Sequence, residues 1–190
     1  MGIPVLNHIS ESDYLKAERL ATEKHEYFRG EIFAMSGTTI EHNIIAVNCI
    51  SELRNRLKGK RCRPYESNLR IHIPKNSLYT YPDISIIFGD VDTLEDKFDT
   101  ATNPTVIFEI LLKSTRDYDK GGKFTLYRDI ETLKEYILID TEKVGVEKFT
   151  RNDDNSWLLT EYKTLEESFK ITSVEVELKL IDIYEDVKLE

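Results

Sequence analysis

Two carboxylates lie in apolar segments of the chain, where hydrophobic residues would be expected. Asp83 lies in segment 81–88 and Glu109 in segment 105–112, and both segments are rich in β-branched and aromatic residues that favour strands. A charged carboxylate in such a strand destabilises the fold by several kcal/mol unless a metal ion, a cation or hydrogen bonds compensate it. Two such acids on strands that could be neighbours favour a site for a divalent metal ion.

The chemistry that such a pair could perform is the hydrolysis of a phosphodiester. Neighbouring strands lie about 4.8 Å apart, so Asp83 and Glu109 at the same level could both reach one Mg²⁺ at about 2.1 Å. A bound Mg²⁺ would lower the pKa of its water and screen charge on the phosphodiester. A lysine nearby would stabilise the same charge. The two-residue period of a strand places Lys113 on the face that carries Glu109.

The rest of the sequence predicts the elements that hold these acids. Helical spacing of apolar residues predicts helices over 11–20, 39–58 and 117–129. Ser12 or Asp13 is the expected cap of the first helix, and Gly59 ends the second and longest one. Alternation predicts a hairpin bent at Arg29-Gly30 and strands over 61–73, 81–88, 105–112, 135–140, 144–150 and 157–163. We therefore predict one domain over residues 1–190, of the α/β (α+β) class, with the acids on the second and third strands of a mixed sheet.

The charge of the chain bears on its partners. The net charge is −9 over 190 residues, which at first argues against nucleic acid. Residues 153–190 hold eleven acids and four Lys or Arg, whereas residues 1–152 hold 24 acids and 22 Lys or Arg, a balance of −2. The acidity therefore belongs mainly to the C-terminal segment and does not exclude a nucleic-acid partner.

Targeting and redox features are few. No segment is apolar over the roughly 18 residues that a bilayer requires, and the N-terminus carries no secretory pattern. Cys49 and Cys62 have neither CxxC spacing nor nearby histidine ligands, which favours two reduced thiols. We expect a cytoplasmic bacterial protein without a membrane partner.

Several short motifs occur in a recognisable order along the chain. They are Lys24-His25-Glu26-Tyr27, Gly30-Glu31-Ile32, Glu41-His42-Asn43, Tyr79-Thr80-Tyr81-Pro82-Asp83, Glu109, Asp119 and Gly122-Lys123-Phe124 with Tyr127. In this order and spacing the chain resembles the PD-(D/E)XK nuclease superfamily, and within it the Uma-type family of restriction endonucleases. The resemblance extends from about Tyr14 to the C-terminal strands.

The resemblance implies a fold, an activity and a set of site residues. The fold is a restriction-endonuclease-like mixed β-sheet core flanked by helices, with extra N- and C-terminal strands. The activity is endonucleolytic hydrolysis of DNA that depends on Mg²⁺ or Mn²⁺, with Asp83, Glu109 and the backbone carbonyl of Ile110 as metal ligands. The superfamily usually has its lysine where this chain has Leu111, and the Uma-type branch places it on the following helix, at Lys123. Cutting both strands of a duplex implies a homodimer.

Two departures from the family pattern keep alternatives open. The usual Ser and Pro after Glu109 are Leu112 and Lys113 here, so Lys113 could replace or crowd Lys123. An acid that often precedes Leu-Arg is Asn68 in this chain. A catalytically silent DNA-binding or protein-interaction module of the same fold is therefore the alternative function. A hydrolase acting on RNA or another phosphodiester is a third.

Other polar residues have two interpretations each. Glu41 and His42, at the start of the long predicted helix, could join the site or cap the helix. The basic stretch at the end of that helix could contact phosphates or simply be a solvated helix end. Its candidate contact residues are Arg54, Lys58, Lys60 and Arg61.

Overall fold

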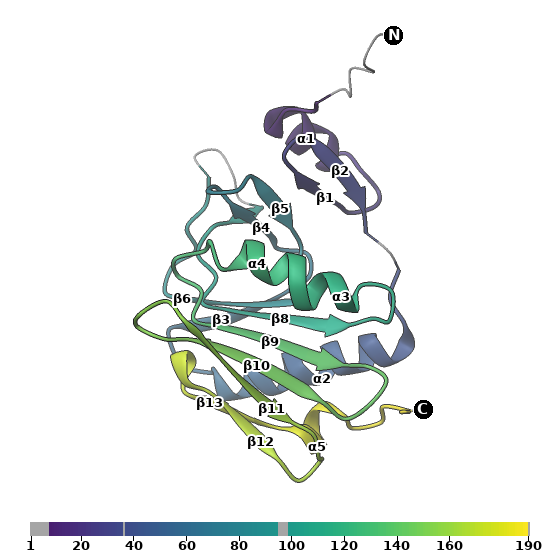
Figure 1. Ribbon diagram of the computed structural model, residues 1–190, viewed down its shortest axis with the longest axis vertical. Helices are drawn as coiled ribbons and strands as arrows, with labels where there is room; N and C mark the ends of the chain where they lie inside the picture. Colours follow the sequence, from purple (N-terminus) through teal and green to yellow (C-terminus); the bar gives the residue numbers. More distant parts are fainter. Residues whose placement is uncertain (1–7, 36, 95–98, 190) are drawn as a thin grey trace.

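A six-stranded mixed sheet forms the centre of the computed structural model, which describes residues 8–35, 37–94 and 99–189. Its strands, in spatial order, are β11 (Trp157–Tyr162), β10 (Val146–Arg151), β9 (Glu135–Asp140), β8 (Val106–Leu111), β6 (Ile84–Phe88) and β3 (Cys62–Glu66). β8 and β9 are parallel, and the other neighbours are antiparallel. The predicted mixed sheet flanked by helices is confirmed (Figure 1).

Both faces of this sheet are covered, as Figure 1 shows. Alternate residues of β8 point to opposite sides: Phe108 and Ile110 join a core cluster with α2 (Ile40–Arg56), whereas Ile107 joins a second cluster with Tyr127. This is the alternation that the two-residue period of a strand requires. Glu109 therefore faces the side that carries Tyr127, within an otherwise apolar layer.

The long predicted helix is α2, and its capping positions one of the candidate residues. Thr39 is the N-cap, and its Oγ1 accepts a hydrogen bond of 3.2 Å from the backbone N–H of His42. Ile45, Cys49 and Leu53, four residues apart, are fully buried against the sheet. The cap fixes the first turn of α2, so the position of His42 is fixed with it.

A second sheet stands beside the first and consists of shorter strands. In spatial order these are β2 (Glu31–Ala34), β1 (His25–Phe28), β5 (Leu78–Thr80), β4 (Arg70–Ile73) and β7 (Thr100–Ala101). The predicted hairpin is confirmed: β1 and β2 pair around Arg29 and Gly30, whose φ angles of 48° and 93° are those of a tight left-handed turn. β1 also pairs with β5, so the N-terminal hairpin lies beside the segment that leads into β6.

The segment between β8 and β9 is helical but irregular. It comprises α3 (Arg116–Tyr118), a π-helical turn η1 (Asp119–Lys123) and α4 (Phe124–Tyr127). The predicted helix over 117–129 is therefore present, although it ends at Tyr127 and contains a π turn. Such turns widen a helix locally and often occur at functional sites. Both terminal residues of this turn, Asp119 and Lys123, are buried.

The remaining elements lie at the ends of the chain. α1 (Glu11–Glu18) packs Tyr14 against Tyr27 and Tyr79. The extra C-terminal strands are β12 (Ser168–Ile171) and β13 (Val176–Lys179), joined by the short helix η2 (Thr172–Val174) and followed by α5 (Leu180–Ile183). No helix in the described ranges is long and apolar enough to cross a membrane.

Four expectations about local structure are wrong. The predicted strand 61–73 is two strands in different sheets, because the chain turns at residues 67–69, where the N–H of Leu69 donates to the carbonyl of Glu66. Asp83 precedes β6 instead of lying within it. β8 ends at Leu111, so Lys113 lies in the following turn and not on the strand face of Glu109. The cap of α1 is Ser10, which accepts the N–H of Asp13.

A cluster of ion pairs around Asp99 joins the second sheet to the end of α1 and gives a test of the fold. Arg70 on β4 is buried, and its Nη2 lies 2.9 Å from Oδ2 of Asp99. Arg19 also reaches Asp99, with its Nε at 2.9 Å from Oδ2. The hydrogen bond from Arg19, helped by the charge of Arg70, lowers the pKa of Asp99 to about 2 against the opposing effect of burial.

We expect Asp99→Asn to lower the free energy of unfolding by about 1–2 kcal/mol at pH 7, allowing for the solvent that reaches this carboxylate. Because the folded-state pKa of Asp99 is depressed, its contribution is complete above the unfolded value near 4 and is lost as the pH falls towards 2. Urea unfolding at pH 7 and pH 3 measures this difference. If the free energy of unfolding differed between variant and wild type by the same amount at both pH values, the proposed contribution of the Asp99 ion pairs would be contradicted.

Candidate functional site

Asp83 and Glu109 lie next to each other at the edge where β6 begins and β8 ends. Ile84 pairs with Phe108 in the antiparallel register, so the next step along both strands brings Asp83 opposite Glu109. The backbone N–H of Ile110 donates to Oδ2 of Asp83 at 2.7 Å, which ties the two strands together at this level. The predicted neighbourhood of the two acids is therefore present.

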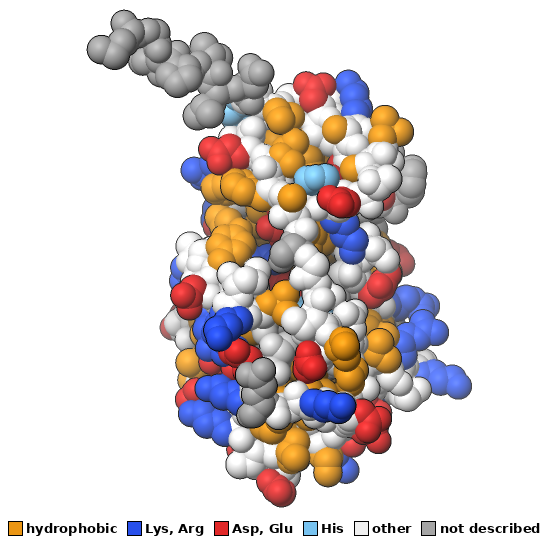
Figure 2. Space-filling view, turned by 90° about the vertical axis from the view of Figure 1, so that its right-hand side faces the viewer, with side chains coloured by type: hydrophobic (Ala, Val, Ile, Leu, Met, Phe, Trp, Pro, Cys, Tyr) orange, Lys and Arg blue, Asp and Glu red, His pale blue; other side chains and the backbone are white. Residues whose placement is uncertain are grey.

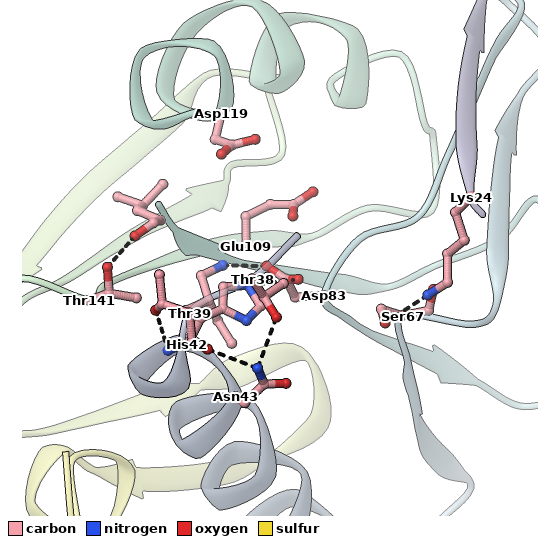
Figure 3. Close-up of polar contacts among 12 residues, drawn as sticks. Lys24, Thr38, Thr39, His42, Asn43, Ser67, Asp83, Glu109, Asp119 and Thr141 are labelled. Carbon is pink, nitrogen blue, oxygen red and sulfur yellow. Dashed lines mark hydrogen bonds and ion pairs between the residues drawn. The ribbon is translucent and has the colours of Figure 1, made fainter. Parts of the chain in front are cut away.

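His42 holds the other oxygen of Asp83. Its Nε2 lies 3.1 Å from Oδ1 of Asp83, and its ring is buried. Figure 3 shows His42 reaching Asp83 from the first turn of α2, with Thr39 and Asn43 of the same turn close by. The carboxylate is thus fixed from two directions, and each of its oxygens keeps a lone pair for a further ligand. Glu41 is half-buried and does not line the cavity that contains these groups.

Glu109 has one occupied and one open oxygen. Lys123 Nζ lies 2.9 Å from Oε1, and the hydroxyl of Tyr127 donates to the same Oε1 at 2.8 Å. In the described part of the chain no group donates a hydrogen bond to Oε2. This oxygen is not fully enclosed by protein atoms, so solvent reaches it. Burial raises the pKa of the Glu109 carboxyl, and the charge of Lys123 opposes this only in part.

Lys123 lies among several carboxylates. Besides Glu109, its Nζ lies 3.3 Å from Oε1 of Glu26 and 3.7 Å from Oδ1 of Asp119. Burial disfavours the charge of Lys123, but the surrounding carboxylates, Glu109 foremost, outweigh burial and raise its pKa. Burial also raises the pKa of Asp119. Three acids thus surround one lysine, a fourth acid, Asp83, lies beside Glu109, and this excess of negative charge favours a bound cation.

These groups line a single cavity of about 740 Å³. Figure 3 shows Asp119 reaching from the helical segment towards Glu109, with Asp83 and His42 on the other side of Glu109. The polar groups of the cavity are accompanied by an apolar wall. Its side chains are Phe28, Phe33, Ala34, Met35, Leu78, Leu112, Tyr118 and Leu126.

Two groups of predicted residues lie away from this cavity. Lys113 is exposed in the turn after β8 and does not line the cavity, whereas Lys123 does. The basic residues Arg54, Lys58, Lys60 and Arg61 are exposed at the opposite end of α2 from His42, about 18 Å along the helix. Lys60 donates there to the carbonyls of Val174 and Glu175. On the face drawn in Figure 2, Lys and Arg are interspersed with Asp and Glu.

Three residues of the cluster had no predicted role in the site. Glu26 arrives from β1, Asp119 from the π turn and Tyr127 from α4. The four-residue spacing of Asp119 and Lys123 is a signal that they share a helix face. Glu26 gives no such signal, because only the pairing of β1 with β5 brings it to the cavity.

The donor set fits a hard divalent cation. Carboxylate and carbonyl oxygens are the ligands that Mg²⁺ prefers, and Asp83, the open Oε2 of Glu109 and the carbonyl of Ile110 are of this type. Within residues 8–35, 37–94 and 99–189, no three His, Cys, Asp or Glu side chains are arranged to hold a metal ion. A cation here would therefore take several of its ligands from water or substrate, as Mg²⁺ usually does.

Comparison with known proteins gives concordant results. Residues 12–181 match the model of the Uma2 family, described as "Putative restriction endonuclease". An uncharacterized protein of Synechocystis is 37% identical over 155 residues, covering 82% of this chain and 80% of that protein. A second uncharacterized protein from the same organism is 34% identical over 161 residues, covering 85% of this chain and 91% of that protein. A crystal structure titled as a "putative nuclease belonging to DUF820" from Anabaena variabilis superposes with a TM-score of 0.74 at 18% identity, covering 93% of this chain and 97% of that one.

Proposed function

Because the chain belongs to the Uma2 family of "putative restriction endonucleases", we propose that it is a nuclease that hydrolyses DNA phosphodiester bonds with Mg²⁺ or Mn²⁺ as cofactor. The observation that carries this proposal is the meeting of Asp83, Glu109 and Lys123 in one cavity, with an open carboxylate oxygen on Glu109. Two acids can hold a metal ion, and a lysine beside them can stabilise the charge that develops on a phosphodiester during hydrolysis.

Asp83 and Glu109 form the proposed metal site, together with the carbonyl of Ile110. The N–H of Ile110 and the ring of His42 hold the Asp83 carboxylate in place, while Tyr127 fixes the orientation of Glu109. When bound, Mg²⁺ supplies charge neutralisation at the phosphate and makes water more acidic. The role of His42 is therefore to position Asp83.

Lys123 is the proposed group that stabilises the charge on the phosphate. Its ammonium points among Glu109, Glu26 and Asp119, so it is held in place before substrate arrives. Such preorganisation lets a charge act in the transition state without a reorganisation cost. Glu26 is in turn held by the hydroxyl of Thr80 on β5, which donates to its Oε1.

A homodimer is proposed for substrates that are cut in both strands. One cavity of this kind can act on one strand at a time, and a two-fold axis would present a second cavity to the antiparallel strand. Size-exclusion chromatography with light scattering measures whether the chain is a dimer.

We expect Mg²⁺ and Mn²⁺ to stabilise the protein and to activate cleavage of a supercoiled plasmid. At a hundredfold excess over its Kd, a ligand of the folded state adds about 2.7 kcal/mol, which raises the melting temperature by about 5–10 °C for a chain of this size. Asp83→Asn should lose both effects, because it removes one ligand charge.

Glu41→Gln is the matched control, since Glu41 lies next to His42 yet outside the cavity lining. It should behave like wild type in both assays. Absence of metal-dependent stabilisation and of cleavage in the wild type would instead favour the catalytically silent alternative. Equal cleavage by Asp83→Asn and wild type would remove Asp83 from the site.

A further inference from the structure

Two aromatic rings on the wall of the cavity are exposed. Phe33 on β2 is 48% exposed and Tyr118 on α3 is 43% exposed, and both line the cavity that contains Glu109 and Lys123. Exposed aromatic rings bordering a polar site are typical of positions that bind a flat apolar group. The fold therefore leaves two ring surfaces open directly beside the proposed reaction site.

The strand register shows how close Phe33 lies to the catalytic groups. Phe33 is the direct cross-strand partner of Glu26, so their side chains lie on the same face of the hairpin with Cβ atoms about 5 Å apart. Glu26 contacts Lys123 at 3.3 Å. Only Glu26 therefore separates a group stacked on Phe33 from the ammonium of Lys123, which would bind the phosphate.

Tyr118 is held on the other wall by the shape of the π turn. It directly precedes Asp119, and the edge of its ring packs over Gly122, where an added Cβ would lie 3.1 Å from Cδ2 of Tyr118. A Cβ at position 122 would fit only if the ring shifted by a few tenths of an ångström. The lack of a side chain at Gly122 thus keeps the Tyr118 ring beside the site.

A recessed site of this kind is poorly suited to an intact duplex. Glu109, Asp119 and Lys123 are 4%, 5% and 6% exposed, so a phosphate must enter the cavity to reach them. The cavity, at about 740 Å³, has the size of a pocket for a small molecule. Duplex binding relies on many phosphate contacts, whereas the candidate contact residues Arg54, Lys58, Lys60 and Arg61 lie at and beyond the end of α2 that is far from His42.

We propose that the substrate strand enters this cavity unpaired, with a base next to the scissile phosphate stacked on Phe33 and Tyr118. The inference rests on the proposed nuclease function and narrows its substrate to single-stranded or locally unpaired DNA. Stacking on aromatic side chains gives affinity with little sequence preference, because every base has a flat π-face. Cleavage of an unpaired strand takes one active site and therefore does not require a dimer.

The test compares binding and cleavage of one mixed-sequence oligonucleotide as a single strand and as a blunt duplex. Fluorescence anisotropy with the full chain in Ca²⁺ measures binding, and gel analysis with Mg²⁺ or Mn²⁺ measures cleavage. We expect the single strand to bind at least about tenfold more tightly than the duplex. Phe33→Ala should weaken single-strand binding by about tenfold, and Phe33→Trp, which keeps a stacking ring, should restore it.

Leu159→Ala is the control for loss of an exposed apolar side chain, because Leu159 is 46% exposed on β11, away from the cavity lining. It should bind like wild type. Equal affinity for both oligonucleotides, or unchanged binding by Phe33→Ala, would overturn the inference even if the protein cleaves DNA. Selective single-strand binding without cleavage in any metal would uphold the stacking site while overturning the nuclease assignment.

Discussion

We expect Glu109→Gln to reduce DNA cleavage by about a hundred- to a thousandfold and, at pH 8, to make the metal-free protein more stable than wild type. The loss of cleavage is of the size seen when one preorganised charged or polar group leaves an active site. Gln keeps an oxygen for the donors Lys123 and Tyr127, so the packing of the cavity is preserved. The variant therefore tests the charge of Glu109 separately from its shape.

The gain in stability follows from the pKa of Glu109. Burial raises it in the folded state, so the folded protein holds a proton on this carboxyl over a pH range in which the unfolded chain has lost it. Stability from this group is complete below the ordinary carboxyl pKa and is lost as the pH rises through the folded-state value. Glu109→Gln removes this titrating group, so the free energy of unfolding of the variant should decline less between pH 5 and pH 8 than that of wild type.

Urea unfolding in EDTA at pH 5 and pH 8 measures this effect, and the same titration with Mg²⁺ measures the metal. Wild type should recover stability with Mg²⁺ at pH 8, and the variant should not, because its charge is absent. Parallel pH profiles for the two proteins would mean that Lys123 already neutralises Glu109 and that no cation is needed there.

The sequence predicts some parts of this site because they depend on local pattern. Asp83 and Glu109 interrupt two apolar runs, and the period of two is enough to predict which face of β8 carries Glu109. Thr39 is the N-cap of α2, which places His42 in the first turn, and Gly59, with a φ of 81°, lies two residues after the C-cap Leu57. The neighbourhood of the acids and the long helix are therefore predictable from the sequence.

Other parts depend on contacts between distant segments. Glu26 reaches the cavity only because β1 pairs with β5, more than fifty residues away. The alternation in 61–73 continues through a turn, so the pattern does not reveal that β3 and β4 belong to different sheets. Extending the strand period past Leu111 predicts Lys113 on the face of Glu109, but the N–H of Thr115 donates to the carbonyl of Leu112 and the chain turns there. Only the family resemblance identifies Lys123, since nothing in its own segment predicts a π turn.

We expect Lys123→Met to lower the free energy of unfolding, because the acids around Lys123 lose their positively charged partner. The substitution leaves the buried Glu109 and Asp119 and the half-buried Glu26 without a positive partner, and breaking such a cluster lowers the free energy of unfolding by about 3–5 kcal/mol. The pKa values of Glu109 and Asp119 are already raised by burial and should rise further. The loss should therefore be larger at pH 8 than at pH 5, because protonated acids need no partner.

Lys120→Met is the matched control, because Lys120 lies on the same π turn but is half-exposed and pairs with Glu147 outside the cavity lining. It should change stability by less than about 1 kcal/mol and leave cleavage intact. Equal losses for Lys123→Met at pH 5 and pH 8 would mean that Lys123 contributes packing and not charge. If the pH-dependent loss occurs and Mg²⁺ reverses part of it without restoring cleavage, then cation and lysine have separate tasks. The cation neutralises the acids, and the ammonium of Lys123 acts on the phosphate.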